Sequence, residues 1–315
     1  MIDVKRLKVL REVAQQGSFS AAGEALGYTQ SAVSQQIAAF ERETGTTLVE
    51  RNARGVRLTD AGRALVEHAD GILARLTAAE DELEAIAGLR GGRVRLASFP
   101  TAGATLVPFA IADFSQRHPE VELSLVEAEP EEAIPALKGG ELDIALTFEY
   151  ESYGKAVWQP EHSDVELVHL LDDPMHLALP ADHPYVRKRQ LHLDDLAEEL
   201  WIQGDCNGMC GRMHIQACQA AGFEPRVGFQ SDDYNVVQGL VAAGVAISLI
   251  AEMALTNVRD DIVIRSLGKQ APVRHVSAAV LAGGYRSPAT EAMLEVLQGA
   301  AAQYPKRRSL KLAAA

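Results

Sequence analysis

Three cysteines and one histidine lie close enough in the sequence to bind a metal or to respond to oxidation. Cys206, Cys210 and Cys218 span thirteen residues, and His214 stands between the last two. On one continuous helix, Cys210, His214 and Cys218 would share a face, because they are four residues apart. Thiolates and imidazoles are zinc ligands, and accessible thiolates oxidise reversibly. Burial on an amphipathic helix is the simpler interpretation, so a redox or metal role is the alternative hypothesis.

A second group of polar side chains has the spacing of a surface that could read DNA. Residues 29–43 are predicted to form a helix, because Val33, Ile37 and Phe40 recur at helical spacing. Glutamine and serine side chains can hydrogen-bond to base edges in the major groove. The side opposite the apolar face carries such residues with little charge: Gln30, Ser31, Ser34 and Gln35. From periodicity alone, a solvated polar face explains this row equally well.

The segments before this helix supply the turns and caps of a compact helical unit. Residues 4–16 repeat apolar side chains at helical spacing and end at Gly17, and a short helix follows Ser18. Gly27 makes the turn that leads to Thr29 and the next helix. Ser18 and Thr29 are residue types that cap helices. Their hydroxyl groups are also candidates for contacts with DNA phosphates.

Residues 46–58 predict a β-hairpin, because two strand-like runs flank the turn sequence Asn-Ala-Arg-Gly. The hairpin carries Arg51 and Arg54, which suit contacts with phosphate or with the minor groove. Both could instead be solvated or paired with nearby glutamates. A long helix over residues 61–88 follows, with an apolar stripe and charged flanks. That pattern predicts a helix–helix contact between two copies of the chain.

From residue 93 onward, strand-like and helix-like segments alternate, which predicts mainly parallel sheets with helices on both faces. The expected strands are residues 94–97, 121–127, 142–147, 175–179, 200–203, 245–250 and 276–281. The expected helices are residues 105–117, 131–137, 208–221, 233–243 and 288–303.

Ligands of such sheets bind beyond the carboxyl ends of the strands, next to helix N-termini. This rule selects six candidate ligand-binding residues, which are Ser98, Thr101, Thr147, Gln203, Ser231 and Asp232. An ordinary strand–helix loop would account for each of them singly.

The charge is distributed unevenly over a composition that is ordinary for a globular protein. The chain has 315 residues, enough for two or three domains, and a formal net charge of −13. Residues 1–63 hold nine Lys and Arg against seven Asp and Glu, so the acid lies downstream. The acidic remainder should limit non-specific binding to DNA. No stretch approaches the ~20 apolar residues of a membrane helix and no signal-peptide core is present, so we expect a cytoplasmic protein without a membrane partner.

The N-terminal segment resembles the DNA-binding domain of LysR-type transcription regulators. Three pieces carry the resemblance: Ser-Phe-Ser-Ala-Ala before the turn, Thr-Gln-Ser-Ala-Val-Ser on the third helix, and Leu-Val-Glu-Arg with Leu-Thr-Asp-Ala-Gly around the hairpin. The family often has Arg or Lys where Gln35 stands, which puts base preference in doubt, and it favours Phe where Val49 stands. A looser similarity continues to about residue 300, to effector domains that resemble periplasmic binding proteins.

The resemblance implies a domain organisation. An N-terminal winged helix-turn-helix, all-α with a β wing, would cover residues 1–60. A linker and dimerisation helix with a hinge would cover 61–90. An α/β two-lobe periplasmic-binding-protein-like effector domain would follow over residues 91–305, with a tail over 306–315. Lobe one would take residues 91–167 and 268–305, and lobe two would take 168–267.

These observations predict a sequence-specific DNA-binding transcription regulator of the LysR type, controlled by a small-molecule effector bound between the two lobes. The resemblance implies four partners: a double-stranded DNA operator, an effector of unknown identity, further copies of the chain in a dimer or homotetramer, and RNA polymerase. We expect no cofactor, no metal and no enzymatic activity, because no catalytic motif is present. The alternative is a redox- or metal-responsive regulator that uses Cys206, Cys210 and Cys218.

Overall fold

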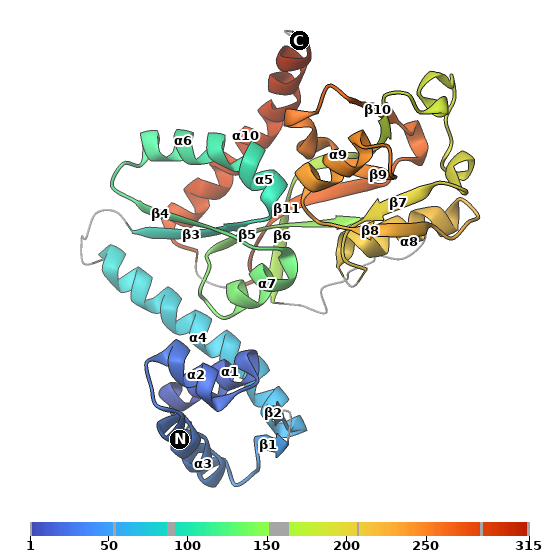
Figure 1. Ribbon diagram of the computed structural model, residues 1–315. Coiled ribbons are helices and arrows are strands. Elements are labelled where there is room, and N and C mark those ends of the chain that lie inside the picture. Colours follow the sequence, from blue (N-terminus) through green and yellow to red (C-terminus); the bar gives the residue numbers. More distant parts are fainter. Residues whose placement is uncertain are drawn as a thin grey trace.

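The computed structural model describes residues 2–52, 55–86, 92–150, 164–206, 208–283 and 286–313. Its N-terminal part is a three-helix unit followed by a hairpin and a long helix (Figure 1). The three helices are α1 (Val4–Gln16), α2 (Phe19–Leu26) and α3 (Gln30–Thr44). Side chains of Asp3, Ser18 and Thr29 accept hydrogen bonds from backbone N–H groups at the three N-termini. These caps satisfy amide groups that have no partner within the helix.

The predicted apolar face of α3 forms the centre of this unit. Val33 and Phe40 have no exposed surface, and Ile37 exposes 2%. They pack with Leu10 from α1 and with Leu48 ahead of the hairpin. The prediction of a helix with one buried face is therefore confirmed.

The hairpin is held close to the helices on both sides. Its strands β1 (Val49–Asn52) and β2 (Gly55–Leu58) pair antiparallel, as predicted. The Val56 amide donates to the Gly17 carbonyl oxygen over 2.9 Å, which ties the hairpin to the turn between α1 and α2. A Cβ atom at Gly62 would lie 2.1 Å from the Leu48 carbonyl oxygen, so the next helix can approach the hairpin only with glycine there.

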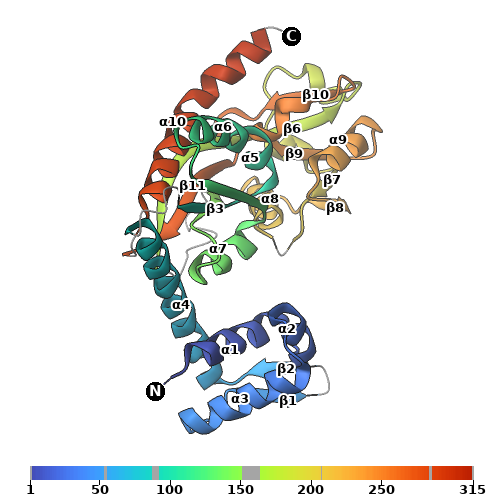
Figure 2. The ribbon, with the colours of Figure 1, turned by 90° about the vertical axis from the view of Figure 1, so that its left-hand side faces the viewer.

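That next helix, α4 (Asp60–Ile86), leads from the N-terminal unit to the larger α/β part (Figure 2). Arg11 of α1 also bridges the two parts. Its Nη1 donates to the Gly139 carbonyl oxygen over 2.9 Å, and its Nη2 lies 2.6 Å from Glu141 Oε1. Because the Arg11 side chain exposes only 12% of its surface, water screens this contact weakly.

In the described residues of the larger part, nine strands form one continuous sheet, in the order β4-β3-β5-β11-β6-β9-β7-β8, with β10 paired to β6. The strands are β3 (Arg93–Ser98), β4 (Glu122–Glu127), β5 (Ile144–Tyr150), β6 (Val165–Pro180), β7 (Leu200–Gln203), β8 (Arg226–Gln230), β9 (Ile247–Ala251), β10 (Ile262–Ser266) and β11 (Val273–Leu281). We call β4, β3 and β5 the first half and β9, β7 and β8 the second half.

The long strand β6 and its neighbour β11 join the two halves. Residues 165–174 of β6 pair with β11, and residues 175–178 pair with β9. Within each half the strands are parallel, as predicted, whereas β6 and β11 run antiparallel to their neighbours. This change of partner at Met175 lies beyond residue 167, the predicted end of the first segment of lobe one, and the domain bounds themselves stay a prediction.

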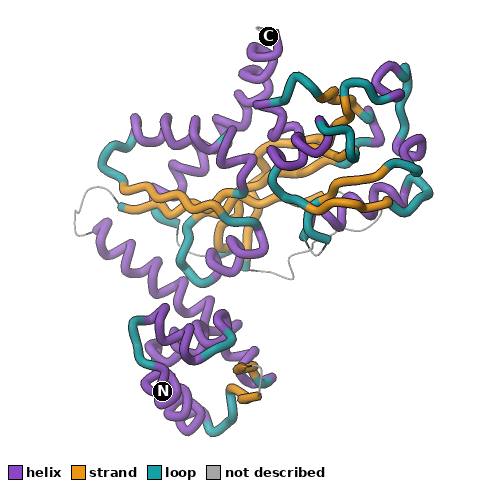
Figure 3. The backbone as a smooth tube through the Cα atoms, in the orientation of Figure 1, coloured by secondary structure: helices purple, strands orange, loops and turns teal. Residues whose placement is uncertain are grey.

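Helices cover both faces of the sheet (Figure 3). They are α5 (Pro100–Thr105), α6 (Val107–Arg117), α7 (Pro130–Lys138), α8 (Met209–Ala220), α9 (Tyr234–Ala242) and α10 (Pro288–Ala313). Short 3-10 turns are η1 (Pro184–Arg187), η2 (Leu193–Leu196), η3 (Glu252–Asn257) and η4 (Gly268–Gln270). In the first half, α6 and α10 pack on one face and α7 on the other. In the second half, α8 packs on one face and α9 on the other.

Several elements differ from the sequence prediction. Strands β8 and β10 were not predicted, and β6 is far longer than its predicted core at residues 175–179. The predicted helix at 105–117 is confirmed as α6 (Val107–Arg117), whereas the short helix α5 that Pro100 opens ahead of it was not predicted. Helix α10 continues to Ala313, so residues 306–313 of the predicted tail are helical. No helix in the described ranges is long and apolar enough to cross a membrane.

Substituting Ile37→Ala should lower the free energy of unfolding of the N-terminal unit by ~2–5 kcal/mol, because it leaves a cavity in a packed core. The matched control is Gln36→Ala on the adjacent exposed position, which should change it by less than ~0.5 kcal/mol. Urea unfolding followed by circular dichroism measures both. Equal stabilities of the two variants would contradict the packing described for α3.

Candidate functional site

The exposed side of α3 carries the predicted base-reading residues. Gln30, Ser31 and Gln35 are exposed, Ser34 is half-buried, and all four lie off the face formed by Val33, Ile37 and Phe40. Their side chains can therefore meet a partner without disturbing the core. Whether they contact bases stays a prediction.

Ser18 and Thr29 act as helix caps. The Ser18 side chain accepts from the Ser20 amide over 3.3 Å, and the Thr29 hydroxyl accepts from the Ala32 amide over 3.2 Å. A cap hydroxyl keeps its own hydrogen for another acceptor, so capping does not exclude a phosphate contact. Arg54 and the side chain of Arg51 lie outside the described residues, so the predicted contacts of the hairpin stay predictions.

A cavity of about 560 Å³ lies between the two halves of the sheet. Four of the six predicted ligand-binding residues line it: Thr101 from the first half, and Gln203, Ser231 and Asp232 from the second. Gln203 ends β7, and Ser231 and Asp232 connect β8 to α9. The rule that ligands bind beyond strand ends therefore locates this cavity correctly, although ligand binding by these residues stays a prediction.

Ser98 and Thr147 do not line the cavity. Ser98 exposes 1% of its surface, and its hydroxyl donates to the Phe99 carbonyl oxygen over 3.1 Å. Strand β5 runs on to Tyr150, so Thr147 lies within it rather than at its end. Successive side chains of a strand point to opposite faces. Because Phe148 lines the cavity, Thr147 faces away from it and is fully buried.

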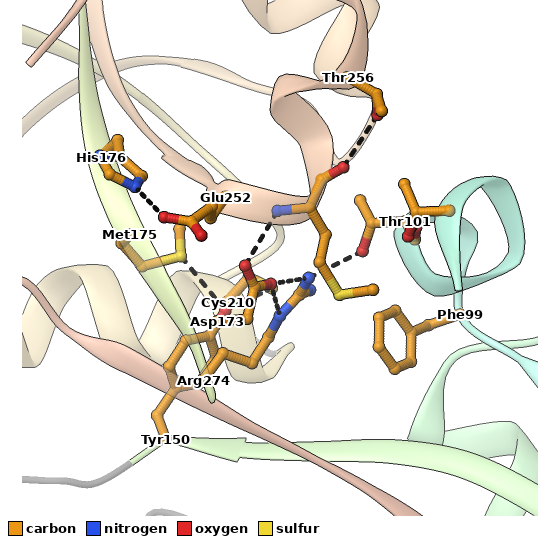
Figure 4. A network of polar contacts seen from close by, with 12 residues as sticks. Phe99, Thr101, Tyr150, Asp173, Met175, His176, Cys210, Glu252, Thr256 and Arg274 are labelled. Carbon is orange, nitrogen blue, oxygen red and sulfur yellow. Dashed lines mark hydrogen bonds and ion pairs between the residues drawn. The ribbon is translucent and has the colours of Figure 1, made fainter. Parts of the chain in front are cut away.

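Arg274, which lines the cavity, forms a buried ion pair with Asp173 where β11 pairs with β6 (Figure 4). The Arg274 Nε and Nη2 atoms donate to Asp173 Oδ2 over 3.0 and 2.5 Å. Nη2 also donates to the Thr101 hydroxyl over 2.8 Å, and Asp173 Oδ1 accepts from the Met253 amide over 2.9 Å. One pair thus contacts the first turn of α5 and the start of η3.

Two aromatic rings complete the surroundings of this guanidinium group. The Arg274 Cζ atom lies 4.8 Å from the ring centres of Phe99 and of Phe148. Burial by itself lowers the pKa of Arg274, but the charge of Asp173 together with the nearby Tyr150, Tyr234 and Cys210 groups raises it overall. The group stays charged, as a cation over aromatic faces and beside a carboxylate should.

The three cysteines lie in different surroundings. Cys206 is exposed, whereas burial raises the pKa of Cys218 to about 12 and also raises the pKa of Cys210. The Cys210 sulfur lies 3.5 Å from the Tyr150 hydroxyl oxygen. Burial lowers the pKa of His214 to about 4, so this ring is neutral at pH 7. Among the described residues, no three His, Cys, Asp or Glu side chains gather as a metal site would require.

Comparison with known proteins identifies the family. The model described as a bacterial regulatory helix-turn-helix protein, lysR family, matches residues 4–63, and that of the LysR substrate binding domain matches residues 87–302. The chain belongs to the LysR family of transcription regulators. It is thus a DNA-binding regulator with an effector-binding domain, as the sequence predicted.

Relatives and solved structures of LysR-type regulators match along the length of this one. The uncharacterized regulator YvbU of Bacillus subtilis is 30% identical over 280 residues, covering 88% of this chain and 91% of that protein. The dual regulator OxyR of Escherichia coli is 27% identical over 303 residues, covering 94% and 95%. A full-length OxyR variant of Pseudomonas aeruginosa has a TM-score of 0.67 at 22% identity, covering 95% of both chains. CbnR in complex with its target DNA has a TM-score of 0.58 at 23% identity, covering 95% and 100%.

Sequence reasoning missed the ion pair of this LysR-type regulator. The two residues are 101 positions apart, and only the pairing of β6 with β11 places them side by side. A charged residue at the start of an apolar strand is the one signal that could have selected Arg274.

Substituting Asp173→Asn should lower the free energy of unfolding of the effector domain by ~3–5 kcal/mol, because it leaves the Arg274 charge buried without its partner. The matched control is Asp172→Asn on the same strand, whose side chain is 60% exposed and should cost less than ~1 kcal/mol. Both tryptophans of the chain lie in this domain by sequence position, so fluorescence during urea unfolding measures it. Indistinguishable midpoints would refute the importance given to this pair.

Proposed function

We propose that this regulator binds a specific duplex DNA site through α3 and the β1–β2 hairpin, and that a small molecule in the cavity alters this binding. The observation that carries the proposal is the two-sided surface of α3. One side anchors the helix through Ile37 and its neighbours, and the other presents Gln30 and Gln35 to solvent. A helix with such a surface fits the major groove, and glutamine pairs well with the N6 and N7 atoms of adenine.

An unpartnered apolar stripe on α4 supports the proposal that the regulator binds DNA as a dimer. Ile72, Leu76 and Leu83 are exposed by 42%, 39% and 66%, and their spacing places them on one side of the helix. Two copies that pair along this stripe would present two α3 helices, which suits a pseudo-palindromic operator. A dimer of dimers and contact with RNA polymerase belong to the same proposal through the family resemblance.

The cavity supports control by a ligand, because its lining comes from both halves of the sheet. Thr101 and Phe99 belong to the first half, and Gln203 and Asp232 belong to the second. A ligand that touches both halves stabilises one relative arrangement of them over another. By linkage, a ligand that changes the affinity for DNA must itself bind differently when DNA is bound.

Substituting Gln30→Ala should reduce the affinity for the preferred operator by ~1–3 kcal/mol and the affinity for random duplex DNA much less, because a lost base contact removes discrimination. The operator would be selected from a random duplex library, and both affinities measured at one fixed salt concentration. Gln15→Ala, at an exposed position on α1, is the control and should leave both affinities unchanged. If Gln30→Ala lowers both affinities equally, Gln30 only positions the helix.

A second candidate function is a response to peroxide. Two relatives are named hydrogen peroxide-inducible genes activators, and the one from Dickeya chrysanthemi is 27% identical over 279 residues. Cys206 is the exposed thiol of the three and precedes α8, which lines the cavity. Peroxide would oxidise such a thiolate to a sulfenic acid with release of water.

If the regulator responds to peroxide, micromolar hydrogen peroxide should change its affinity for the operator, and Cys206→Ser should abolish this change. Mass spectrometry would locate the added oxygen at Cys206. Cys218→Ala is the control, since burial and a raised pKa make that thiol unreactive. An oxidised Cys206 with unchanged DNA affinity would refute the redox candidate and leave the ligand-controlled regulator standing.

A further inference from the structure

The charges around the cavity are strongly unbalanced. Among the described residues that line it, Arg274 is the only cation, and its charge is matched by Asp173. The same lining includes four carboxylates, those of Glu127, Glu129, Asp232 and Asp233. The cavity is therefore a region of net negative charge, which attracts cations and repels anions.

These carboxylates come from both halves of the sheet. Glu127 ends β4 and Glu129 precedes α7, whereas Asp232 and Asp233 precede α9. Asp232 accepts from the Asp205 amide over 3.2 Å and Asp233 from the Asn235 amide over 2.8 Å. Such backbone bonds stabilise a carboxylate without cancelling its charge. Like charges on the two halves then oppose the closing of the cavity.

The pKa of Glu129 is set first by its burial and then by the charges around it. Burial is the largest cause of a rise in its pKa to about 7. Neighbouring charges act as well: Arg274 opposes the rise, and three carboxylates add to it, those of Glu131, Asp232 and Glu127. Glu129 is in part exposed, so solvent screens these charge interactions.

In the lining of the cavity, two buried polar atoms have no hydrogen-bond partner. They are Gln203 Oε1 and His214 Nε2, in side chains that expose 7% and 3% of their residues' surface and that both line the cavity. Buried polar atoms are almost always paired, so each marks a place for a missing partner. The amide oxygen accepts hydrogen bonds, and a neutral imidazole offers one accepting nitrogen. A ligand that donates hydrogen bonds would satisfy Gln203 Oε1, and it would also satisfy His214 Nε2 in the tautomer whose proton is on Nδ1.

Apolar side chains fill much of the remaining wall: Phe99, Phe148, Met175, Met213, Leu249 and Met253. Aromatic and thioether groups favour an apolar or aromatic ligand body over a small inorganic ion. A volume of about 560 Å³ is in the range of sites for small organic molecules.

We propose that the cavity binds an organic cation, an ammonium or amidinium-type group on an apolar body, whose charged head lies between Glu129 and Asp232. The proposal rests on the proposed function of the cavity as the effector site and specifies the chemistry of its ligand. The bound cation removes the repulsion between the two halves and donates hydrogen bonds to acceptors that otherwise have none. Closure of the halves on the cation is the conformational signal.

The test uses two pairs of molecules that have the same shape and opposite charge: benzamidine with benzoate, and phenethylamine with 3-phenylpropanoate. Isothermal titration with the full chain at pH 7.5 should show that each cation binds at least about tenfold more tightly than its partner, a difference of about 1.4 kcal/mol. Benzoate or 3-phenylpropanoate binding as tightly as its cationic partner would overturn the proposal. So would a failure of both cations to bind.

Two variants locate the cation. Glu129→Gln and Asp232→Asn should each weaken cation binding by about tenfold, and Asn keeps an oxygen for the Asp205 amide. Glu120→Gln, an exposed change away from the cavity, is the matched control and should bind as the unaltered chain does. Fluorescence-monitored unfolding checks that each variant is folded. Unaltered cation affinity in both cavity variants would refute the assigned position.

The pH dependence gives an independent readout. Because the cation prefers an ionised Glu129, its affinity should rise from pH 6 to pH 8 in the unaltered chain and change less in Glu129→Gln. The other charged groups that face Glu129 are Glu127, Glu131, Asp232 and Arg274. They are the same in the unaltered chain and in Glu129→Gln, so a difference between the two pH profiles comes from Glu129.

Binding to the selected operator separates this proposal from the proposed function. If benzoate binds in the cavity and changes operator affinity, the regulator is ligand-controlled but the cation class is wrong. If cations bind as expected and the chain has no preferred duplex, the cavity chemistry stands and the DNA-binding proposal fails.

Discussion

The pairing of Asp173 with Arg274 is the interaction on which the rest of the effector domain depends. Both residues lie on the strands that join the halves of the sheet, and both are almost fully buried. Neither charge could stay there alone, since an unpaired buried ion costs several kcal/mol. The pair also orders its surroundings, because Thr101 and the Met253 amide bond to it from opposite sides of the cavity.

The same pair determines what the cavity can recognise. In an unpaired state, Arg274 would be an anchor for an anionic ligand. Because Asp173 already occupies its Nε and Nη2 atoms, its charge is largely cancelled within the wall. The carboxylates that line the cavity then set the sign of the field. A single buried aspartate thus shifts the preference of the cavity from anions toward cations.

The sequence predicted what local patterns control and missed what depends on distant pairing. The three N-terminal helices follow from the spacing of residues such as Ile37 and from caps such as Thr29. Strand β8 was missed because all of its residues are exposed, so no alternation of apolar and polar side chains marks it. Strand β6 was predicted only toward its C-terminal end, where most of its residues are buried.

The same distinction separates the cavity residues that the sequence predicted from those that it missed. Gln203 and Asp232 were found because the ends of parallel strands gather at one edge of a sheet. Thr147 was misplaced because that argument requires the true end of β5, which runs three residues further. A one-residue difference in a strand turns a side chain to the other face. Glu129 was not selected, since a glutamate before a helix looks the same whether or not an opposing carboxylate faces it.

Helix α7 links the cavity to the N-terminal three-helix unit through its two ends. Glu129 precedes it at the cavity, and Gly139 follows it where Arg11 of α1 binds. Its nine residues span about 13 Å, and Pro135 in its interior has no N–H group to donate to the preceding turn. The helix therefore connects the cavity at one end with the three-helix unit at the other through a single short element that contains a weak point. A displacement of its first turn would move the Gly139 carbonyl oxygen that Arg11 binds, unless the helix bends at Pro135.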